Sequence, residues 1–510
     1  MKMKDGKSAI DRQFGDFQTP LDLARMVCNL LYKQGVRPVS ILEPTCGWGN
    51  FLLAAFDTFD SVRKAIGMDI NPEYVNYVSQ KLGSKHLSGL TEVRQSDFFD
   101  TDWENILDDL PEPVLVIGNP PWITSSELTK LEGQNLPRKA NFRNFSGLDA
   151  VTGKSNFDIS EWMLIQLLNA LANRNATLAM LCKTAVARKV LFYLWSKNFH
   201  FRETSMYLID AKRFFSASVS ACLLVCRIGS APGSAQCEVY VGLDQQTYQT
   251  TFALLDGQMV ANRDNYERWK HLIGSEYYKW RSGIKHDCQK VMELTRDGQR
   301  YRNGLGEVID LEDTHVFPML KSADMKDSPP VPRKWMLVPQ LSIGEPTHSL
   351  RRIAPKTWEY LQKHRTLLEN RRSAIYRNRP AFSVFGVGKY SFALWKVAIS
   401  GLYKRLHFAV VGPYAGRPVV LDDTCYFIAC QTEEEAEHLA GLLNSEIARQ
   451  FFEAFVFWDD KRPITLEVLS KLDLLALARE LGSEQVIRQF LQLAAPDSPK
   501  YEQLALLGSC

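Results

Sequence analysis

The sequence predicts an α/β fold built on a parallel sheet in the first half of the chain, followed by a mixed α+β second half. Two patterns support this prediction. Buried strand-like runs alternate with helix-like runs over residues 21–122, and each strand ends in a polar side chain. A Gly- and Ser-rich stretch at residues 229–236 then marks the clearest change in composition. We therefore expect a first domain at 1–232, a second at 233–480 and a helical tail at 481–510.

The first elements surround a short glycine turn. Pro20 suits the first turn of the opening helix, with Thr19 as its cap. The first strand ends in Glu43, and a turn containing Gly47 and Gly49 leads into the next helix. Glycines at such a turn let a ligand approach the backbone closely, and a carboxylate at the strand end suits a cationic or amino-bearing ligand.

Three further strands extend this pattern. The second ends at Asp69, an acid about twenty residues past the glycine turn, which suits ribose hydroxyls. The third ends in Asp97-Phe98, an acceptor for an adenine amino group beside a ring that can cover its face. The fourth, residues 113–119, ends in Asn119. Because the carboxyl ends of parallel strands share one edge of a sheet, these side chains should line a single ligand site.

Asn119-Pro120-Pro121-Trp122 is the stretch that specifies a reaction. The nitrogen of a ring-bound NH2 group is a poor nucleophile because its lone pair is delocalised into the ring. If the side-chain oxygen of Asn119 and the carbonyl of Pro120 each accept one N–H, that lone pair is aimed at an electrophile. The two prolines stiffen the loop, and Trp122 is expected to stack on the ring. The alternative is a Pro-Pro turn with an incidental tryptophan.

Composition narrows the class of protein. The net charge is only +3, so any affinity for nucleic acid must come from where the charges lie. The ten cysteines are scattered without zinc-ligand spacing, which favours reduced thiols and no metal. No apolar run has the length of a membrane span and the N-terminus lacks a signal peptide, so a cytoplasmic protein with no membrane contact is expected.

The order of these motifs resembles the gamma-class amino-methyltransferases of DNA, which use S-adenosyl-L-methionine and mostly methylate adenine N6 in restriction-modification systems. The resemblance rests on Gln18-Thr19-Pro20, residues 43–51, Asp69-Ile70, Asp97-Phe98 and residues 119–122, and it continues more faintly through the second half. It implies a Rossmann-like class I methyltransferase sheet with a C-terminal mixed α+β target-recognition domain. The family more often has Tyr or Phe where Trp122 stands.

The resemblance also implies residue roles. The residues near the methionyl part of the cofactor would be Thr19, Glu43, Thr45, Gly47 and Gly49. Asp69, followed by Ile70, would bind the ribose, while Asp97 and Phe98 would meet the adenine of the cofactor.

Residues 212–220 resemble the family loop whose aromatic side chain stacks on an extruded base. Phe214 is the candidate, with Phe215 as the alternative if the turn is one residue tighter. A pair of core phenylalanines is the other interpretation. Upstream, residues 123–156 form a polar segment that either contacts DNA or is a surface insertion; its basic residues are Lys130, Arg138, Lys139 and Arg143.

The second half carries the densest positive charge. Residues 280–287 and 316–324 resemble the two landmark loops of the family's target-recognition domain. Aromatic residues are then interleaved with cations in a pattern typical of phosphate contact and groove reading. These cations are Arg351, Arg352, Lys363, Arg365, Arg371, Arg372, Arg377, Arg379, Lys389, Lys396, Lys404 and Arg405.

The sequence therefore predicts a site-specific DNA adenine-N6 methyltransferase that flips its target base out of double-stranded DNA. A separate cognate restriction endonuclease is the expected partner, because no nuclease motif is apparent. Cytosine-N4 methylation stays open as an alternative, although Asn119 favours adenine. A non-catalytic DNA-recognition subunit is a further alternative. Glutamine methylation in proteins is disfavoured by the basic second half.

Overall fold

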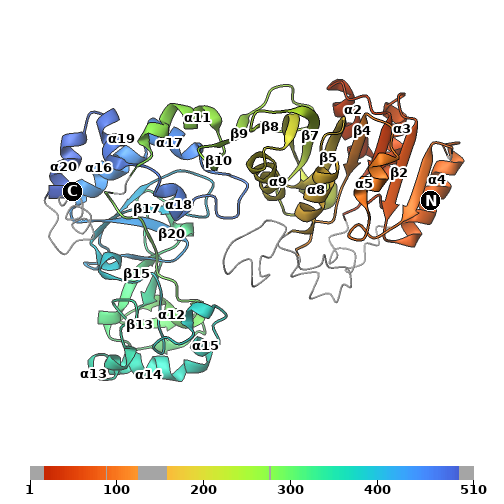
Figure 1. Ribbon diagram of the computed structural model, residues 1–510. Helices are drawn as coiled ribbons and strands as arrows, with labels where there is room; N and C mark the ends of the chain where they lie inside the picture. The colour runs from red at the N-terminus through yellow and green to blue at the C-terminus, as the bar shows by residue number, and fades with distance from the viewer. Residues whose placement is uncertain (1–16, 88, 125–157, 275–276, 493–510) are drawn as a thin grey trace. The chain divides into compact units, whose positions relative to one another are not determined.

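The computed structural model describes residues 17–87, 89–124, 158–274 and 277–492. The chain divides into two compact units, Met1–Arg263 and Asp264–Cys510 (Figure 1). Among the described residues, no helix combines the length and the apolar character needed to span a bilayer.

Unit 1 is built on one ten-stranded sheet in the order β10-β9-β8-β6-β7-β5-β4-β1-β2-β3. The strands β1 to β5 are parallel, and β7 runs antiparallel between β5 and β6. They span Ser40–Glu43, Lys64–Asp69, Thr91–Gln95, Val114–Gly118, Ala176–Lys183, His200–Ile209 and Ala221–Pro232 for β1 to β7. The edge is extended by β8 (Gln236–Tyr240), β9 (Thr250–Leu255) and β10 (Gln258–Val260). The predicted Rossmann-like parallel sheet is confirmed.

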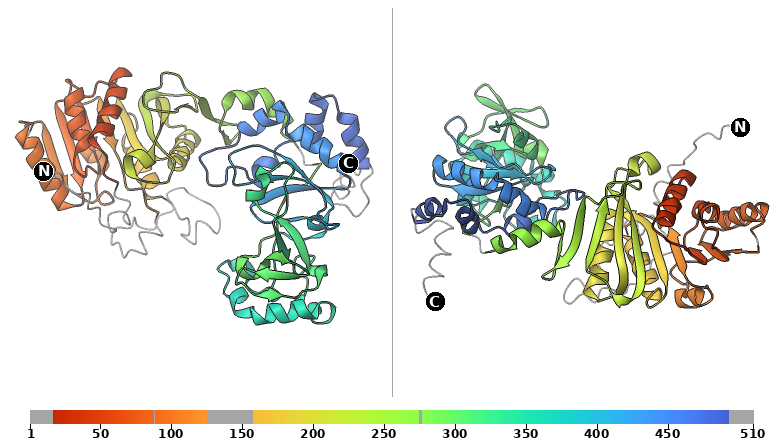
Figure 2. Two further views of the ribbon diagram at one scale, coloured as in Figure 1. Left: turned by 180° about the vertical axis from the view of Figure 1, so that it is seen from behind. Right: turned by 90° about the horizontal axis from the view of Figure 1, so that it is seen from above.

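Helices cover both faces of this sheet (Figure 2). On one face α2 (Leu21–Lys33) packs against α3 (Asn50–Thr58), with α4 (Pro72–Ser84) beside β2 and β3. On the other, α8 (Ile159–Ala170) packs against α5 (Trp103–Asp108) and α9 (Thr184–Ser196). The central strands β1, β4 and β5 are therefore buried almost throughout, which explains their nearly continuous apolar sequence.

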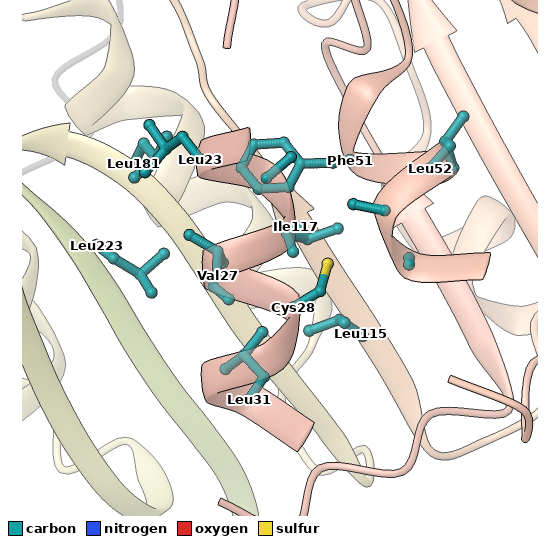
Figure 3. Close-up of a cluster of buried hydrophobic side chains, with 14 of the residues drawn as sticks. Leu23, Val27, Cys28, Leu31, Phe51, Leu52, Leu115, Ile117, Leu181 and Leu223 are labelled. Carbon is teal, nitrogen blue, oxygen red and sulfur yellow. The ribbon is translucent and has the colours of Figure 1, made fainter. Parts of the chain in front are cut away.

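The core between α2 and the sheet shows why this helix forms. Leu23, Val27 and Leu31 recur every four residues and are fully buried. They face strand side chains such as Ile117 and Leu223 (Figure 3). The predicted helix is thus confirmed, but its N-cap is Pro20 without a side-chain hydrogen bond, so Thr19 does not cap it.

The end of unit 1 differs from the boundary expected after residue 232. The strand β7 continues to Pro232, and β8 joins the same sheet by pairing with β6. A Cβ atom on Gly233 would collide with the carbonyl oxygen of Phe201. The glycine thus permits close packing beside β6, so the composition of this stretch reflects a tight strand connection.

Unit 2 contains two sheets. The four-stranded sheet has the order β11-β20-β17-β18, with β11 at Arg281–Ser282, β17 at Trp395–Ser400, β18 at Ala409–Val411 and β20 at Cys425–Cys430. The six-stranded sheet has the order β14-β13-β12-β16-β15-β19. Its strands are β12 (Glu293–Asp297), β13 (Arg300–Asn303), β14 (Val308–Ile309), β15 (Val316–Leu320), β16 (Lys334–Leu337) and β19 (Val420–Leu421).

The helices of unit 2 are mostly short. They begin with α11 (Arg263–Trp269) at the unit boundary, followed by α12 (Gln289–Met292), α13 (Leu350–Ile353), α14 (Pro355–Lys363) and α15 (Arg365–Glu369). A helical hairpin is formed by α16 (Glu433–Leu443) and α17 (Glu446–Glu453). Up to residue 492, where the described residues end, α18 (Leu466–Leu469), α19 (Leu474–Glu480) and α20 (Glu484–Gln492) follow.

Candidate active site at the carboxyl edge of the N-terminal sheet

Four predicted polar side chains gather at one edge of the sheet in unit 1. Glu43 and Asp69 are the last residues of β1 and β2, while Asp97 and Asn119 closely follow β3 and β4. These strands are neighbours in the order β4-β1-β2-β3 and run parallel. Their carboxyl ends therefore meet at the edge where open α/β sheets bind ligands.

The glycine turn has the conformation that its sequence requires. Gly47 and Gly49 have φ of +47° and +68°, a region that favours glycine. A Cβ on Gly47 would collide with the side chain of Gln18, whose Oε1 accepts a hydrogen bond from the backbone N–H of Trp48 at 3.1 Å. A Cβ on Gly49 would lie 2.7 Å from Val78. The turn is thus packed from both sides, with its backbone at the sheet edge.

Asp69 ties this turn to β2. Its Oδ2 accepts from the backbone N–H of Gly47 at 2.8 Å, and its Oδ1 accepts from Asn71 at 2.9 Å. Each carboxylate oxygen has a second lone pair. The side chain can therefore hold the turn and still accept from a ligand hydroxyl.

Glu43 has a structural contact as well. It is 2% exposed, and its Oε2 accepts from the N–H of Leu52 in the first turn of α3 at 3.1 Å. Burial raises the pKa of Glu43 well above its ordinary value, and this outweighs the hydrogen bond from Leu52. The carboxyl group thus fixes the start of the helix that follows the glycine turn.

The third strand end differs from the predicted arrangement in detail. Asp97 accepts from the N–H of Phe99 at 2.9 Å. The ring of Phe98 is buried among aromatic neighbours, with its centroid 4.5 Å from that of Trp103. Ile70, in contrast, is 49% exposed at the end of β2. Ile70 therefore offers a larger exposed apolar surface at this edge than Phe98 does.

Two threonines connect the turn to neighbouring segments. The hydroxyl of Thr45 lies 3.5 Å from the carbonyl oxygen of Asn119 and donates to it. Thr19 is buried, and its carbonyl accepts from the side chain of Asn50 at 2.8 Å. The segment before α2, the glycine turn and the loop after β4 are therefore held together.

Asn119 is positioned by a residue that the sequence patterns did not single out. Its Nδ2 donates to the carbonyl oxygen of Phe17 at 2.7 Å. This contact orients the amide and uses its donor, so Oδ1 is the remaining polar atom of the side chain, an acceptor. That oxygen is buried and has no hydrogen-bond partner among the described residues. Phe17 immediately precedes Gln18-Thr19-Pro20. Its position beside that motif is the one feature of the sequence that could have indicated this contact.

The aromatic neighbours of the loop include Phe215. Trp122 is 5% exposed, with its ring centroid 5.4 Å from that of Phe17 and 5.1 Å from that of Phe215. Phe214 is half-buried, and the Arg213 guanidinium lies 5.0 Å from its ring centroid. Of the two candidates, the structure thus places Phe215 in contact with Trp122. Both belong to α10 (Ala211–Phe215).

Several of the predicted DNA-contacting cations in unit 2 have structural partners. Lys363 and Arg365 pair with Glu307 and Glu369 at 2.7 and 2.6 Å. Lys396 is fully buried and donates to the carbonyl oxygen of Val419 at 2.9 Å; burial lowers its pKa to about 7. These three side chains already have partners within the fold.

Arg371 is another structural cation. Its guanidinium donates to the carbonyl oxygens of Leu368, His286 and Ser383 at 2.7, 3.2 and 2.7 Å. It also lies 3.6 Å from the ring centroid of Tyr376. The remaining predicted cations are exposed and lack a carboxylate partner among the described residues; they are Arg351, Arg352, Arg372, Arg377, Arg379, Lys389, Lys404 and Arg405.

The predicted basic loop at 123–156 lies outside the described residues from 125 onward. In the part of the chain that is described, no cluster of three His, Cys, Asp or Glu side chains is arranged to hold a metal ion.

Known proteins resemble this chain over part of its length or, in one case, nearly all of it. The family model described as N-6 DNA Methylase matches residues 4–225. Type II methyltransferase M.NspV of Nostoc sp. (strain ATCC 29411 / PCC 7524) is 44% identical over 472 residues, which cover 92% of this chain and 97% of that protein. Type II methyltransferase M.CvrRI of Paramecium bursaria Chlorella virus XZ-6E is 34% identical over 110 residues, which cover 22% of this chain and 25% of that protein.

A solved structure supports the fold. The type IIL restriction-modification enzyme MmeI, solved in complex with DNA, superimposes with a TM-score of 0.52 at 11% identity, covering 96% of this chain and 71% of that one. At this identity the likeness concerns the fold alone.

The sheet has β7 inserted between β5 and β6, and its carboxyl edge carries a glycine turn and an Asn-Pro-Pro-aromatic loop. Together these features define a methyltransferase that acts on amino groups. The chain belongs to the N-6 DNA methylase family and is a type II DNA methyltransferase by its relatedness to M.NspV. The predicted function, site-specific methylation of adenine N6 in DNA by a modification enzyme, is confirmed.

Proposed function

We propose that the enzyme transfers a methyl group from S-adenosyl-L-methionine to an adenine extruded from double-stranded DNA. In this proposal the cofactor lies along the ends of β1 to β3, and the base lies at the end of β4. The observation that carries the proposal is the Oδ1 atom of Asn119, a buried acceptor without a hydrogen-bond partner among the described residues. A buried acceptor left unpaired costs about 1–3 kcal/mol, so a ligand N–H at this position is stabilising.

The residues at the strand ends fit the cofactor. Asp69 would accept from ribose hydroxyls, Ile70 offers an exposed apolar surface for the adenine, and Asp97 would accept from its amino group. The backbone around Gly47 and Gly49 would approach the methionyl part. Bound S-adenosyl-L-methionine supplies an electrophilic methyl group at this edge.

The other predicted cofactor residues act indirectly, by positioning the segments around the cofactor site. Glu43 holds the start of α3, Thr45 links the turn to the Asn119 loop, and Thr19 anchors Asn50. Phe98, which directly follows Asp97, is 7% exposed and packs within an aromatic cluster.

The base is held at the Asn-Pro-Pro-Trp loop. The Oδ1 atom of Asn119 and the carbonyl oxygen of Pro120 accept the two N–H groups of the target nitrogen, which directs its lone pair toward the methyl donor. Pro121 keeps the loop stiff. The contact between Phe215 and Trp122 favours Phe215 over Phe214 as the stacking partner of the base. The methylated nitrogen then loses its proton to water, so no general base of raised pKa is required.

Unit 2 is the proposed target-recognition domain. Its exposed cations, among them Arg372 and Arg377, suit phosphate contacts because the described chain offers them no carboxylate partner. A concave surface with a volume of about 580 Å³ lies in the same segment, lined by Asp287, Leu367, Asn370, Arg371, Arg372 and Ser373. The gamma subclass and a separate cognate restriction endonuclease belong to this proposal.

A methyl-incorporation assay with product analysis tests the proposal. We expect purified protein with S-adenosyl-L-methionine to yield N6-methyladenine in duplex DNA, and Asn119→Ala to lose single-turnover rate while calorimetry shows near-normal cofactor binding. N4-methylcytosine as the product, or wild-type rates in Asn119→Ala, would contradict the proposed base pocket.

A further inference from the structure

An ion pair lies at the carboxyl edge of β5, beside the proposed base pocket and outside every role described above. The Nζ atom of Lys183 is 2.5 Å from Oδ2 of Asp158. The side chain of Asp158 is 8% exposed and that of Lys183 is 23% exposed. Because the pair is largely withdrawn from water, it is stronger and less screened than a surface ion pair.

Lys183 belongs to the segment that fixes the aromatic loop. It is the last residue of β5 and pairs with Ala221, the first residue of β7. The N–H of Thr184 then donates to the carbonyl oxygen of Ser220 at 3.1 Å. Ser220 ends the loop that follows Phe215, the last residue of α10, and Ala221 begins β7. The position of Lys183 therefore fixes where this loop returns to the sheet.

Asp158 fixes the other side of the pocket. It forms an antiparallel bridge with Thr124, and the N–H of Ile159 donates to the carbonyl oxygen of Ile123 at 2.9 Å. Ile123 and Thr124 directly follow Trp122. Asp158 is itself held, because Oδ1 accepts from the N–H and the hydroxyl of Ser160 at 3.2 and 2.5 Å at the start of α8.

The strand register brings these two sides together. In the parallel pair β4–β5, Gly118 lies opposite Met180. The residues after Gly118 therefore leave the sheet beside the last residues of β5, where Lys183 stands. One ion pair thus connects the loop that contains Asn119 with the loop that follows Phe215.

We propose that the Lys183–Asp158 pair sets the separation of these two loops, which makes Lys183 a positioning residue for adenine methylation. This inference rests on the proposed base pocket. The pair lies on β5 and at the start of α8, whereas the proposed cofactor contacts lie on β1 to β3 and the proposed DNA contacts lie in unit 2. Loss of the pair should therefore act on the methylation rate and leave the binding of both substrates unchanged.

The test compares Lys183→Met with Lys183→Arg in the full-length protein. We expect Lys183→Met to lower the single-turnover rate at saturating DNA and S-adenosyl-L-methionine by about 10- to 100-fold, the effect of displacing a reacting group by roughly 1 Å. The dissociation constants of cofactor and DNA should stay within about twofold of wild type. Lys183→Arg, which keeps the charge, should recover most of the rate.

Lys189→Met is the matched control. Lys189 lies 3.3 Å from the carboxylate of Glu161, whose side chain is fully buried, so this pair joins α9 to α8. It lies within the two helices, whereas the Lys183–Asp158 pair lies where the two loops meet the sheet. We expect Lys189→Met to lower the thermal midpoint by an amount comparable to Lys183→Met and to keep the wild-type methylation rate when both are assayed well below their midpoints.

A double variant tests whether the two side chains act as a unit. If they do, Lys183→Met combined with Asp158→Asn should be no slower than the slower single variant. A wild-type rate in Lys183→Met, or an equal loss of rate in Lys189→Met, would overturn the inference. Failure of the proposed function is separate, because it would appear as wild-type rates in Asn119→Ala whatever the Lys183 variants do.

Discussion

The carboxyl edge of the sheet in unit 1 and the basic segment of unit 2 were both predicted from the sequence, but their residues behave differently. At the sheet edge, Glu43 and Asp69 end two neighbouring parallel strands and Asn119 follows a third, so the fold brings these three residues to one edge. In unit 2, the predicted cations separate into two groups. Some, such as Arg371, are used by the fold, and others, such as Arg372, remain exposed.

The difference teaches what each kind of pattern encodes. A side chain at the end of a parallel strand has its location fixed by the backbone, because all such ends meet at one edge. A cation within a basic segment has no such constraint. Whether it contacts solvent, a carboxylate or a carbonyl depends on residues far away in the sequence, as with Arg371 and His286. Four experiments can break or sharpen this contrast.

The largest expected effect concerns cations that unit 2 uses for folding. Glu293 is buried, and its carboxylate lies 2.5 Å from Lys321 and 2.8 Å from Lys334. Removing one partner of a buried ion pair typically costs 3–5 kcal/mol. Both lysines stay partly solvated, so we expect Glu293→Leu to lower the free energy of unfolding by about 3 kcal/mol. Denaturant titration measures this, and an unchanged midpoint would mean that Lys321 and Lys334 are available to DNA.

The same carboxylate predicts a pH dependence. Burial alone would raise the pKa of Glu293, but hydrogen bonds from His286, Lys321 and Lys334 hold it well below its ordinary value. A depressed carboxyl pKa contributes stability that is fully present above the unfolded value of about 4.3 and is lost as the pH falls toward the folded value. Stability should therefore fall below about pH 5, and Glu293→Leu should flatten this decline.

The contacts of Glu293 with His286, Lys321 and Lys334 could not be predicted from the sequence. The strand ends and the α2 helix were predictable because their signals are local and periodic. The contact of Phe215, rather than Phe214, with Trp122 was not predictable, because it depends on a short helix that ends at Phe215 and is capped by Ser216 with a left-handed φ of 54°. The role of Gly233 was not predictable either, since it reflects close packing against Phe201. Such contacts join residues that no single-sequence pattern relates.

The second experiment concerns Asp69 at the sheet edge. A hydrogen bond to a charged group is worth about 1.5–3 kcal/mol, so Asp69→Ala should weaken S-adenosyl-L-methionine binding by that amount. Asp69→Asn retains one side-chain acceptor and should lose less. Calorimetric titration of the cofactor is the measurement, with DNA affinity as the control. Equal cofactor affinity in all three proteins would remove Asp69 from the proposed ribose contact.

The third experiment separates Phe215 from Phe214. Stacking of a base on an aromatic ring is worth about 1–3 kcal/mol. If Phe215 stacks on the extruded adenine, Phe215→Ala should slow methylation of a matched duplex, and a mismatch opposite the target should restore much of the rate because extrusion is then cheaper. Asn119→Ala should not be restored. Recovery by the mismatch in Phe214→Ala, but not in Phe215→Ala, would return the role to Phe214.

The smallest effect per residue tests the contrast within one segment. Arg372, Arg377 and Arg379 are exposed, whereas Arg371 has its donors directed at backbone carbonyls. A protein that binds one phosphate fewer should show a slope of log affinity against log salt concentration that is shallower by about 0.9.

Neutralising each arginine to glutamine in turn should therefore distinguish the two groups. Arg372→Gln, Arg377→Gln and Arg379→Gln should flatten the salt dependence of DNA binding with little change in the thermal midpoint, because these exposed side chains form no ion pair with a carboxylate of the described chain. Arg371→Gln should lower the thermal midpoint and leave the salt dependence of DNA binding unchanged. It breaks hydrogen bonds to Leu368, His286 and Ser383 and leaves the phosphate contacts in place. If Arg371→Gln flattens the slope and leaves stability unchanged, exposure does not separate the cations that bind DNA from those that hold the fold.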